Sequence, residues 1–444
     1  MIEVTGIGGY SEVGKNMTAV KIDNEVIILD MGFNLPKLID FEEEGGNREN
    51  LTTKGLIDLG AIPNDSFIES WKDKVKAIVI GHCHLDHLGA VPFLARHYNA
   101  PIIGTPYTIE VLRNELKNDN ISLKNELRVV NPNSRVKVSS KLEIELIHIT
   151  HSTLQTALIA IHSPYGTILY ANDFKLDNDP VLGKKPDYAR LKKLGNENVV
   201  CLITESLYAH QEGKTPSENV AKQMLKDVFF GTANESNAIF ATTFASHIAR
   251  LKSIYEFGNQ LGRQVVFLGK SMHKYIKSAE HLNLVKFPDA EIYGFARQVK
   301  KKLKDIEKDG RSDYLVICTG GQGEPESVLN KIVTGRLDFE LMPNDHVIFS
   351  NRTIPATINI ANRNAIEAKL LKKRVSIFRD IHTSGHSYKQ DLRDMITMIK
   401  PKHIIPAHGP QEMQGHLAEL TTPMGYEVGK NFHFMKDGKK INLV

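Results

Sequence analysis

The chain has 444 residues, of which 41% are hydrophobic and 24% are charged, and its formal net charge is +4. This composition is typical of a folded globular protein, and it excludes a disordered or low-complexity chain. The length predicts two or three domains. Because no run of about 18 apolar residues occurs, we expect no membrane-spanning helix and no membrane partner.

The three cysteines, Cys83, Cys201 and Cys318, are scattered along the chain and odd in number. A disulfide framework is therefore not expected, and a reducing compartment is favoured. The first residues, "MIEVTGIGGY", lack the basic flank and apolar block of a signal peptide, so we expect a cytoplasmic protein. A net charge of +4 is compatible with a nucleic-acid partner but does not by itself indicate one.

Apolar runs of strand length occupy the first 200 residues, and each ends in a histidine, an aspartate or both. These runs are "EVIILD", "KAIVIGH", "LEIELIHITH" and "TILYANDF". The segment "LGAVPFLARHYN" between the second and third runs has a helical pattern. Buried strands that end in polar residues predict a functional site at the edge of a sheet.

From about residue 208 the chain alternates between strand and helix patterns. Three segments repeat this scheme: "NAIFATTFASHIARLKSIYEFGNQLG", "RQVVFLGKSMHKYIKSAEHL" and "DYLVICTGGQGEPESVLNKI". The alternation predicts a parallel α/β sheet. After Pro355, "RVSIFRDIHTSGH" and "KHIIPAHG" again read as strands that end in histidines. We therefore predict an α/β domain in two parts, 1–207 and 356–444, interrupted by an inserted domain over 208–355.

The stretch "GHCHLDHLGA", residues 81–90, contains three histidines and an aspartate within six positions. Burying such groups at a strand end without a partner would cost several kcal/mol, and a metal ion removes this cost. His82 and His84 are two residues apart and face the same side of an extended segment. Asp86 and His87 follow where the chain turns into a helix. One motif can therefore supply two adjacent ions, which could together clamp a phosphate, with Asp173 suited to bridge them.

The motif "HCHLDH" resembles the H-x-H-x-D-H signature of the metallo-β-lactamase superfamily. Asp30 after a strand, "THS" and "NDF" follow in the superfamily's order, although Asn172 stands where glycine is more usual. The resemblance implies an αββα sandwich with two metal ions at one edge. It assigns His82, His84 and His151 to the first ion, and Asp86, His87 and His408 to the second. By the same resemblance Asp173 bridges the ions and Asp30 supports the ligands from behind.

The inserted domain and the residues after it resemble the β-CASP nucleases. Their motifs correspond to Glu205 in "TESLYA", His386 in "SGHSYKQDL" and His408 in "IPAHG". The segments "GIGGYSEVGKNM", "CTGGQGEPES", "HVIFSNRTIP" and "IHTSGH" further resemble ribonuclease J, in which bacterial forms commonly have aspartate in place of Glu205. The resemblance is to the short archaeal type, without an N-terminal RNA-binding module or the additional C-terminal domain of bacterial forms.

This resemblance implies a dinuclear-metal ribonuclease that hydrolyses single-stranded RNA from 5′ to 3′ and prefers 5′-monophosphate ends. Zinc is the expected ion, and manganese suits the same ligands. Asp86 would also orient the attacking water or accept its proton. His386 would donate a proton to the leaving 3′ oxygen, with Glu205 orienting it. A homodimer is expected from the family.

Candidates for contacts with RNA come from polar and glycine-rich segments at predicted strand ends. Glycines in "CTGGQGEPES" allow backbone amides to approach a phosphate. Ser246 would either cap the next helix or bind a phosphate oxygen. The lysine-rich "QVKKKLKDIEK" more often forms a solvated helix face than an RNA track. The predicted RNA and phosphate contacts are Ser246, His247, Thr319, Gly320, Gly321, Gln322, Ser350, Ser384, Gly385 and His386.

Three alternatives stay open at this point. An RNA endonuclease of the mRNA 3′-end-processing type would use the same site, and product lengths would distinguish it. A non-catalytic RNA-binding subunit is disfavoured because ligand residues are present at every motif. A hydrolase of small lactones or thioesters is disfavoured by the large insertion and by "TGGQGEP".

Overall fold

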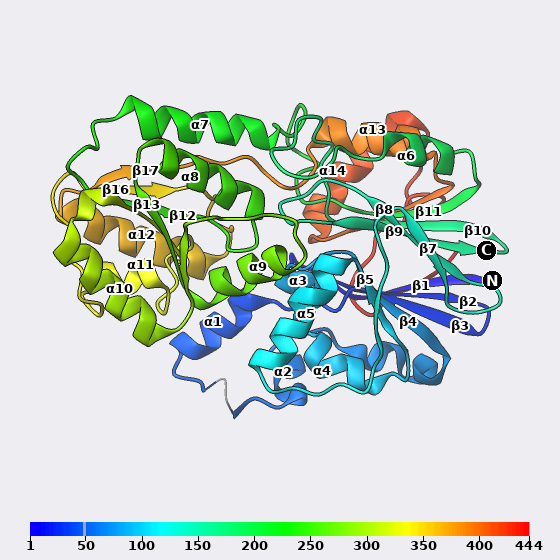
Figure 1. Ribbon diagram of the computed structural model, residues 1–444. Helices are drawn as coiled ribbons and strands as arrows, with labels where there is room; N and C mark the ends of the chain where they lie inside the picture. The colour runs from blue at the N-terminus through cyan, green and yellow to red at the C-terminus, as the bar shows by residue number, and fades with distance from the viewer. Residues whose placement is uncertain (48–49, 444) are drawn as a thin grey trace. The chain divides into compact units, whose positions relative to one another are not determined.

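The computed structural model describes residues 1–47 and 50–443, which form two compact units. The first unit comprises Met1–Asn178, Gly183–Thr215 and Ser384–Val444, and the second comprises Asp179–Leu182 and Pro216–Thr383. Figure 1 labels their helices and strands. Within the described residues, no helix has the length and apolar character needed to cross a membrane.

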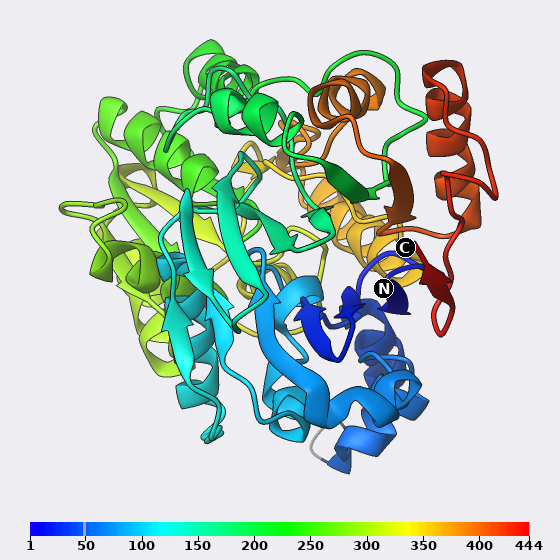
Figure 2. The same ribbon diagram turned by 90° about the vertical axis from the view of Figure 1, so that its right-hand side faces the viewer.

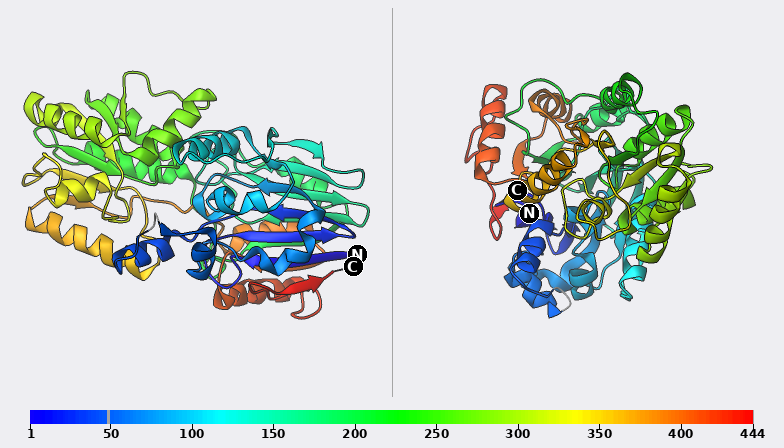
Figure 3. Two further views of the ribbon diagram at one scale, coloured as in Figure 1. Left: turned by 90° about the horizontal axis from the view of Figure 1, so that it is seen from below. Right: turned by 90° about the vertical axis from the view of Figure 1, so that its left-hand side faces the viewer.

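The first sheet of unit 1 has seven strands and is antiparallel on one side and parallel on the other. Across the sheet they are β19 (Lys440–Asn442), β1 (Ile2–Gly8), β2 (Met17–Ile22), β3 (Glu25–Leu29), β4 (Val75–Ile80), β5 (Ile102–Gly104) and β6 (Leu127–Val129). The pairing of β1 with β19 brings the two ends of the chain together, as Figure 2 and both views of Figure 3 show. Parallel β3 and β4 end beside each other, at Asp30 and His82.

The second sheet of unit 1 has six strands. In order they are β18 (His403–Ala407), β11 (Val199–Glu205), β10 (Gly166–Ala171), β9 (Ala157–Ser163), β8 (Glu143–His148) and β7 (Ser134–Lys137). The neighbours β10, β11 and β18 are parallel. Asp173, Glu205 and His408 therefore lie at the same edge of this sheet, because each stands at or just after the carboxyl end of one of these strands.

The two sheets of unit 1 pack face to face. One core cluster contains Val4, Ile27 and Val79 of the first sheet together with Ile144 and Ile203 of the second. The outer face of the second sheet is covered by α6 (Tyr188–Leu194), α13 (Lys389–Ile399) and α14 (Gln411–Thr421). Beside the first sheet lie α2 (Thr53–Asp58), η2 (Asp65–Lys74), α4 (Val91–Leu94) and α5 (Pro106–Asn118). These layers confirm the expected αββα sandwich.

The second unit contains one sheet of six parallel strands, which confirms the predicted parallel α/β insertion. In order they are β14 (Glu291–Tyr293), β13 (Gln264–Leu268), β15 (Tyr314–Cys318), β12 (Ile239–Thr242), β16 (His346–Phe349) and β17 (Ser376–Phe378). The connecting helices are α7 (Glu218–Gly231), α8 (Ile248–Gln260), α9 (Lys270–His281), α10 (Ala296–Asp309), α11 (Val328–Val333) and α12 (Thr357–Lys372). Buried aliphatic side chains of strands and helices form the core of this unit.

The end of the second unit differs from the sequence-based boundary. We predicted an insertion over 208–355, but the compact unit extends to Thr383. The segment "RVSIFRD", which we assigned to the closing part of the first domain, contains β17, and β17 pairs with β16 in the sheet of the second unit. An apolar run shows that a strand forms, but the hydrogen-bonding partner decides which sheet it joins.

The segment after the metal motif also differs from expectation. In place of one helix over "LGAVPFLARHYN", the chain forms α3 (Leu85–Leu88), α4 and a 3-10 turn at Ala95–His97. Pro92 lies in the first turn of α4, where its missing N–H has no intrahelical partner to lose. The predicted strands in the first 200 residues are confirmed as β3, β4, β8 and β10.

Candidate metal centre

The first group of potential metal ligands combines His82, His84 and His151 with Asp173. One donor atom from each lies within 4.8 Å of the others. His82 and His84 follow β4, and His151 follows β8. His84 Nδ1 lies 3.0 Å from His82 Nε2 and 3.1 Å from His151 Nε2. The three imidazoles therefore converge as the sequence analysis expected.

The second group contains Asp86, His87, Asp173 and His408, again with donor atoms within 4.8 Å of one another. His84 is the N-cap residue of α3, and Asp86 and His87 lie in the first turn of this helix. His87 Nε2 lies 3.5 Å from Asp86 Oδ2 and 3.2 Å from Asp173 Oδ2. His408, which follows β18, approaches Asp86 Oδ2 to 3.9 Å through Nε2. The motif thus contributes to two neighbouring groups.

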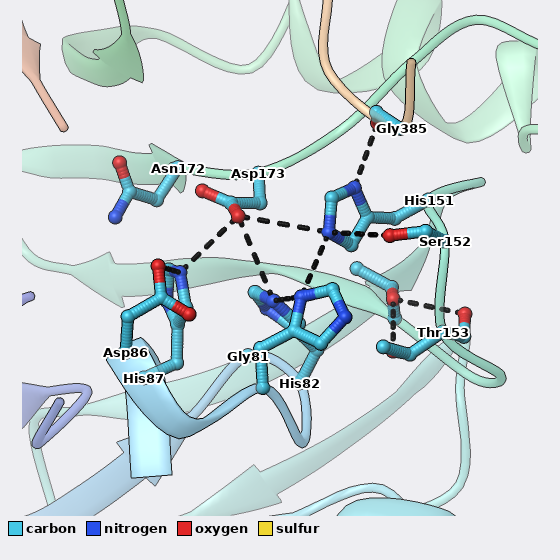
Figure 4. A network of polar contacts seen from close by, with 12 residues as sticks. Gly81, His82, Asp86, His87, His151, Ser152, Thr153, Asn172, Asp173 and Gly385 are labelled. Atoms are coloured by element: carbon cyan, nitrogen blue, oxygen red, sulfur yellow. Dashed lines mark hydrogen bonds and ion pairs between the residues drawn. The ribbon is translucent and has the colours of Figure 1, made fainter. Parts of the chain in front are cut away.

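Asp173 belongs to both groups and is the centre of the constellation in Figure 4. Its Oδ2 lies 3.6 Å from both His82 Nε2 and His151 Nε2, and its Oδ1 is buried without a hydrogen-bond partner. A buried carboxylate oxygen without a partner carries an uncompensated desolvation cost. Nitrogen and oxygen donors around such an oxygen match the ligand preference of divalent zinc or manganese. The residues present therefore fit two divalent ions that share Asp173.

The protonation states of the imidazoles suit metal binding. Burial lowers the pKa of His84 to about 4 and holds those of His82 and His151 well below the ordinary value. The neutral imidazole is the form that binds a metal. For His87, burial favours the neutral form, but the surrounding aspartates outweigh burial and raise its pKa. A cation at this position would replace the proton that these carboxylates otherwise attract.

Partners behind the ligands fix the orientation of each ring. Asp30 accepts the Gly81 N–H at 2.8 Å through Oδ1, and its Oδ2 lies 2.7 Å from His87 Nδ1. His151 Nδ1 donates to the Gly385 carbonyl at 2.7 Å. Each contact turns the other ring nitrogen toward Asp173, which is the usual way in which proteins orient metal-binding histidines. Asp30 thus occupies the supporting position that we expected.

Asn16 is a residue of this site that the sequence analysis did not identify. His408 Nδ1 donates to its Oδ1 at 3.0 Å, and its Nδ2 donates to the Asp86 carbonyl at 3.1 Å. The side chain is buried and also lies 3.2 Å from His87 Nε2. Asn16 therefore connects three residues of the second ligand group. A polar residue in "GKNM", directly before a strand, was the only signal in the sequence.

The backbone is strained at two positions of the centre. Asp30 has φ 60° and His408 has φ 57°, in the left-handed region that residues with a Cβ rarely adopt. Such conformations cost about 1–3 kcal/mol each and persist where the surroundings hold them. Both residues directly follow a strand, so the strain redirects each side chain from the sheet toward the ligand groups.

His386 and Glu205 form a pair next to Asp173. His386 Nδ1 lies 2.7 Å from Glu205 Oε2 and 3.8 Å from Asp173 Oδ2. Glu205 Oε1 accepts the N–H groups of Phe174 and Ser387, so the carboxylate is held from three sides. Burial favours neutral His386, but the neighbouring carboxylates outweigh it and raise the pKa of His386 above its ordinary value. The imidazole side chain is one-fifth exposed, whereas Glu205 is fully buried.

Ser384 and Gly385, predicted to contact phosphate, adjoin this pair in the first unit. Ser384 Oγ accepts the His386 N–H at 3.0 Å. The Gly385 carbonyl holds the ring of His151, and a Cβ at Gly385 would lie 3.0 Å from that ring's Nδ1 and 2.8 Å from Ser152 Oγ. Glycine is therefore required here for close packing on the ring of His151.

The remaining predicted RNA contacts lie in the second unit, after the neighbouring strands β15, β12 and β16. Several of their side chains and carbonyls bond to other residues of this unit. Ser350 Oγ accepts from Arg250 and donates to the Ile381 carbonyl, and the Gly321 carbonyl accepts from Asn351 and Arg363. These residues are Ser246, His247, Thr319, Gly320, Gly321, Gln322 and Ser350.

One expected role in that set is changed by the structure. We considered Ser246 as the cap of the following helix, but the N-cap of α8 is His247, whose Nδ1 accepts the Arg250 N–H at 3.3 Å. His247 Nε2 lies 3.3 Å from Glu218 Oε2 and the side chain is buried. Helix α8 therefore starts one residue later than expected, because the imidazole of His247 accepts an N–H group of its first turn.

Comparison with known proteins agrees with this architecture. The metallo-β-lactamase superfamily matches residues 11–200, the ribonuclease J β-CASP domain matches 236–368, and the Zn-dependent metallo-hydrolase RNA specificity domain matches 373–429. A protein named ribonuclease J from Methanocaldococcus jannaschii is 43% identical over 444 residues, which cover all of this chain and 99% of the relative. The chain belongs to the ribonuclease J family.

Another member of the ribonuclease J family, from Pyrococcus abyssi, is also 43% identical and covers all of this chain and 97% of its own. A crystal structure of a protein of unknown function from Enterococcus faecalis V583 aligns with a TM-score of 0.62 and 18% identity, covering 99% of both chains. The similarity to this crystal structure concerns the fold alone. The matches to the two ribonuclease J proteins span the whole chain, so the family assignment covers both units and the metal centre.

Proposed function

We propose that this protein is a metal-dependent ribonuclease that hydrolyses single-stranded RNA from the 5′ end, with a preference for 5′-monophosphate. The observation that carries the proposal is that Asp173 is shared by two groups of metal ligands and lies beside the His386–Glu205 pair. Its relatives from Methanocaldococcus jannaschii and Pyrococcus abyssi carry the name ribonuclease J, and the match at residues 373–429 is named an RNA specificity domain.

Two divalent ions held by the two groups would polarise a phosphate oxygen and lower the pKa of a water molecule. Zinc is the proposed ion, and manganese would suit the same imidazoles and carboxylates. Asp86 has a side chain that is 31% exposed, so it can orient an incoming water or accept its proton. The buried Asp30 holds His87 and does not reach solvent.

His386 supplies the proton that the leaving 3′ oxygen needs. Its Nδ1 contacts Glu205, which leaves Nε2 as the nitrogen that can donate to substrate. Against the effect of burial, the adjoining Glu205 carboxylate raises the pKa of this imidazole, and the partial exposure of the side chain lets a phosphodiester reach it. Glu205 is a positioning residue, because it is fully buried and acts through His386.

The preference for a 5′-monophosphate rests on the candidate phosphate contacts. Ser384 and Gly385 directly precede His386, and the Ser384 hydroxyl and the Gly385 N–H are groups of the kind that bind phosphate. The loops after β12, β15 and β16 supply further candidates in the second unit. Homodimer formation and a cytoplasmic location remain predictions, and light scattering of the purified protein would test the first.

One experiment tests the proposed activity. An RNA labelled at its 5′ end and bearing monophosphate, triphosphate or hydroxyl is incubated with the enzyme, with and without a chelator. We expect immediate release of labelled mononucleotide, fastest from the monophosphate and lost with chelator. Labelled fragments of internal length, independent of the 5′ group, would instead establish an endonuclease and contradict the proposed direction. No RNA cleavage with zinc or manganese supplied would overturn the ribonuclease proposal itself.

A further inference from the structure

A row of rings extends from the His386 side of the metal centre along the surface of the first unit. We call Tyr208, His210 and His416 the aromatic row. The Tyr208 ring lies 6.1 Å from that of His386 and 6.1 Å from that of His210, and His210 lies 5.6 Å from His416. His210 is exposed, Tyr208 is half-buried, and the His416 side chain is 37% exposed. The row therefore connects a catalytic residue with solvent.

The rings are tilted relative to one another and are not stacked. The interplanar angle is 48° between Tyr208 and His210 and 51° between His210 and His416. The rings therefore meet edge or corner toward face. A partly exposed aromatic ring can accept a planar base by stacking.

The backbone that carries the row is held rigidly. Tyr208 forms a parallel bridge with Tyr388, and their rings lie 5.8 Å apart. The Gln211 carbonyl accepts the Lys389 N–H at 3.0 Å. Thr215 Oγ1 donates to the His386 carbonyl at 2.7 Å and accepts the Tyr388 N–H at 2.9 Å. The loop after β11 is thus tied to the segment that carries His386, so the rings keep a constant position relative to that residue.

The charges around the row favour bases over phosphates as its ligand. Glu419 lies 3.5 Å from His416, and the nearby Lys389 is already paired with Glu212. Phosphate groups would be repelled by such carboxylates and would need unpaired cations. Nucleobases are uncharged and have a π-face on every base, so they stack on aromatic side chains without regard to sequence.

We propose that the aromatic row is a base-binding subsite, on which bases of single-stranded RNA next to the scissile phosphate stack. This inference rests on the proposed ribonuclease function and deepens it. Tyr208 binds the base nearest the reacting phosphodiester, and His210 and His416 continue the surface outward. The row would make binding tolerant of sequence but dependent on unpaired bases, because a base within a duplex has no exposed face.

The test compares Tyr208→Leu with Tyr208→Phe in the full-length, metal-loaded enzyme. The substrates are a single-stranded RNA and the same RNA with abasic nucleotides on both sides of the first scissile phosphate. Loss of stacking predicts a decrease of about 5- to 150-fold in kcat/KM for Tyr208→Leu on intact RNA, mostly through KM. We expect Tyr208→Phe to stay close to wild type and the effect of Tyr208→Leu to shrink clearly on the abasic RNA.

Tyr165→Leu provides a matched control, because Tyr165 is a 37%-exposed tyrosine on the β9–β10 turn. It should leave both substrates unaffected. His210→Leu is a second variant at an exposed position, where folding is not at risk, and it should show a smaller loss of the same kind.

Three results would overturn the inference. They are an unchanged kcat/KM for both Tyr208→Leu and His210→Leu, an equal loss on intact and abasic RNA, or a loss in Tyr208→Phe that matches Tyr208→Leu. The second result would assign the row a structural role only. Failure of the wild-type enzyme to cleave RNA would instead contradict the proposed function, so the two failures are distinguishable.

Discussion

In the first unit, Asp173, Glu205 and His408 stand at or just after the ends of β10, β11 and β18, whereas in the second unit β12, β15 and β16 lead into loops of threonine, glycine and serine. Both sets follow the carboxyl ends of neighbouring parallel strands. In the first unit, imidazoles crowd around carboxylates and a buried oxygen has no hydrogen-bond partner.

In the second unit many polar groups at the strand ends find partners within the protein, although Thr242 Oγ1 and Asn351 Oδ1 are buried without one. Gln322 donates to the Arg352 carbonyl and accepts the Ile354 N–H, and Arg250 forms an ion pair with Glu218 and donates to Ser350. Polar groups at strand ends therefore do not by themselves make a metal site. What distinguishes the first unit, among the described residues, is a concentration of imidazoles and carboxylates whose donor atoms lie close enough together to hold a metal ion.

The largest expected effect is that of Asp173→Asn. Asparagine keeps the shape of the side chain but removes the charge that both ligand groups share, so we expect turnover to fall to the detection limit and bound metal to decrease. Steady-state RNA cleavage and metal content by mass spectrometry measure the two effects. Wild-type metal content together with wild-type turnover would contradict the role of Asp173.

The next effect concerns proton donation. His386→Ala should lower kcat by about 10²- to 10⁴-fold with a small change in KM, because general-acid catalysis contributes about this much. Glu205→Gln should have a smaller effect, since it only weakens the orientation of the ring. His403→Ala, at the opposite end of β18, is the control and should cleave RNA as wild type does. Full turnover in His386→Ala would refute the assignment.

The buried Glu218–Arg250 pair of the second unit should contribute to the stability of the fold. Glu218→Gln leaves the fully buried Arg250 without its carboxylate, and breaking a buried pair costs about 3–5 kcal/mol. We expect the free energy of unfolding to decrease by about this amount, with metal content unchanged. Glu256→Gln, which removes a partly exposed pair with Lys222, should cost at most about 1 kcal/mol. Equal effects of the two variants would contradict the distinction.

Removal of metal should affect the two units differently. A ligand present at about 100 times its Kd stabilises the folded protein by about 2.7 kcal/mol, and chelation removes this contribution. Hydrogen exchange should therefore become faster at the ends of β10, β11 and β18 after chelation, but not at the ends of β12, β15 and β16. Equal acceleration at both sets of strands would show that the metal does not act on the first unit alone.

The smallest expected effect is that of Asn16→Ala. Loss of the hydrogen bond to His408 should weaken metal binding by about 10- to 100-fold, as loss of such supporting partners usually does. Competition with a fluorescent zinc chelator measures this affinity independently of activity. Asn16→Asp restores an acceptor for His408 Nδ1 and should recover part of it. Equal affinities for wild type and Asn16→Ala would remove Asn16 from the site.

Much of the candidate site followed from the sequence because its ligands are marked locally. His82, His84, Asp86 and His87 are close along the chain, and a strand followed by a helix turn directs them to two groups. The strand runs that end in Asp30, His151, Asp173 and His408 are equally local signals. The αββα sandwich and the parallel insertion also follow from periodicity and from the resemblance that these motifs carry.

The tertiary structure decided what depends on contacts between distant residues. Asn16 meets His408 across 392 positions, and the Gly385 carbonyl meets His151 across 234. The pairing of β17 within the sheet of the second unit and the proximity of Tyr208, His210 and His416 are of the same kind. The sequence by itself determined which residues can bind metal, because ligand chemistry and strand-end spacing are local. Only the fold determined which partners hold those residues, because that depends on which strands pair and how loops pack.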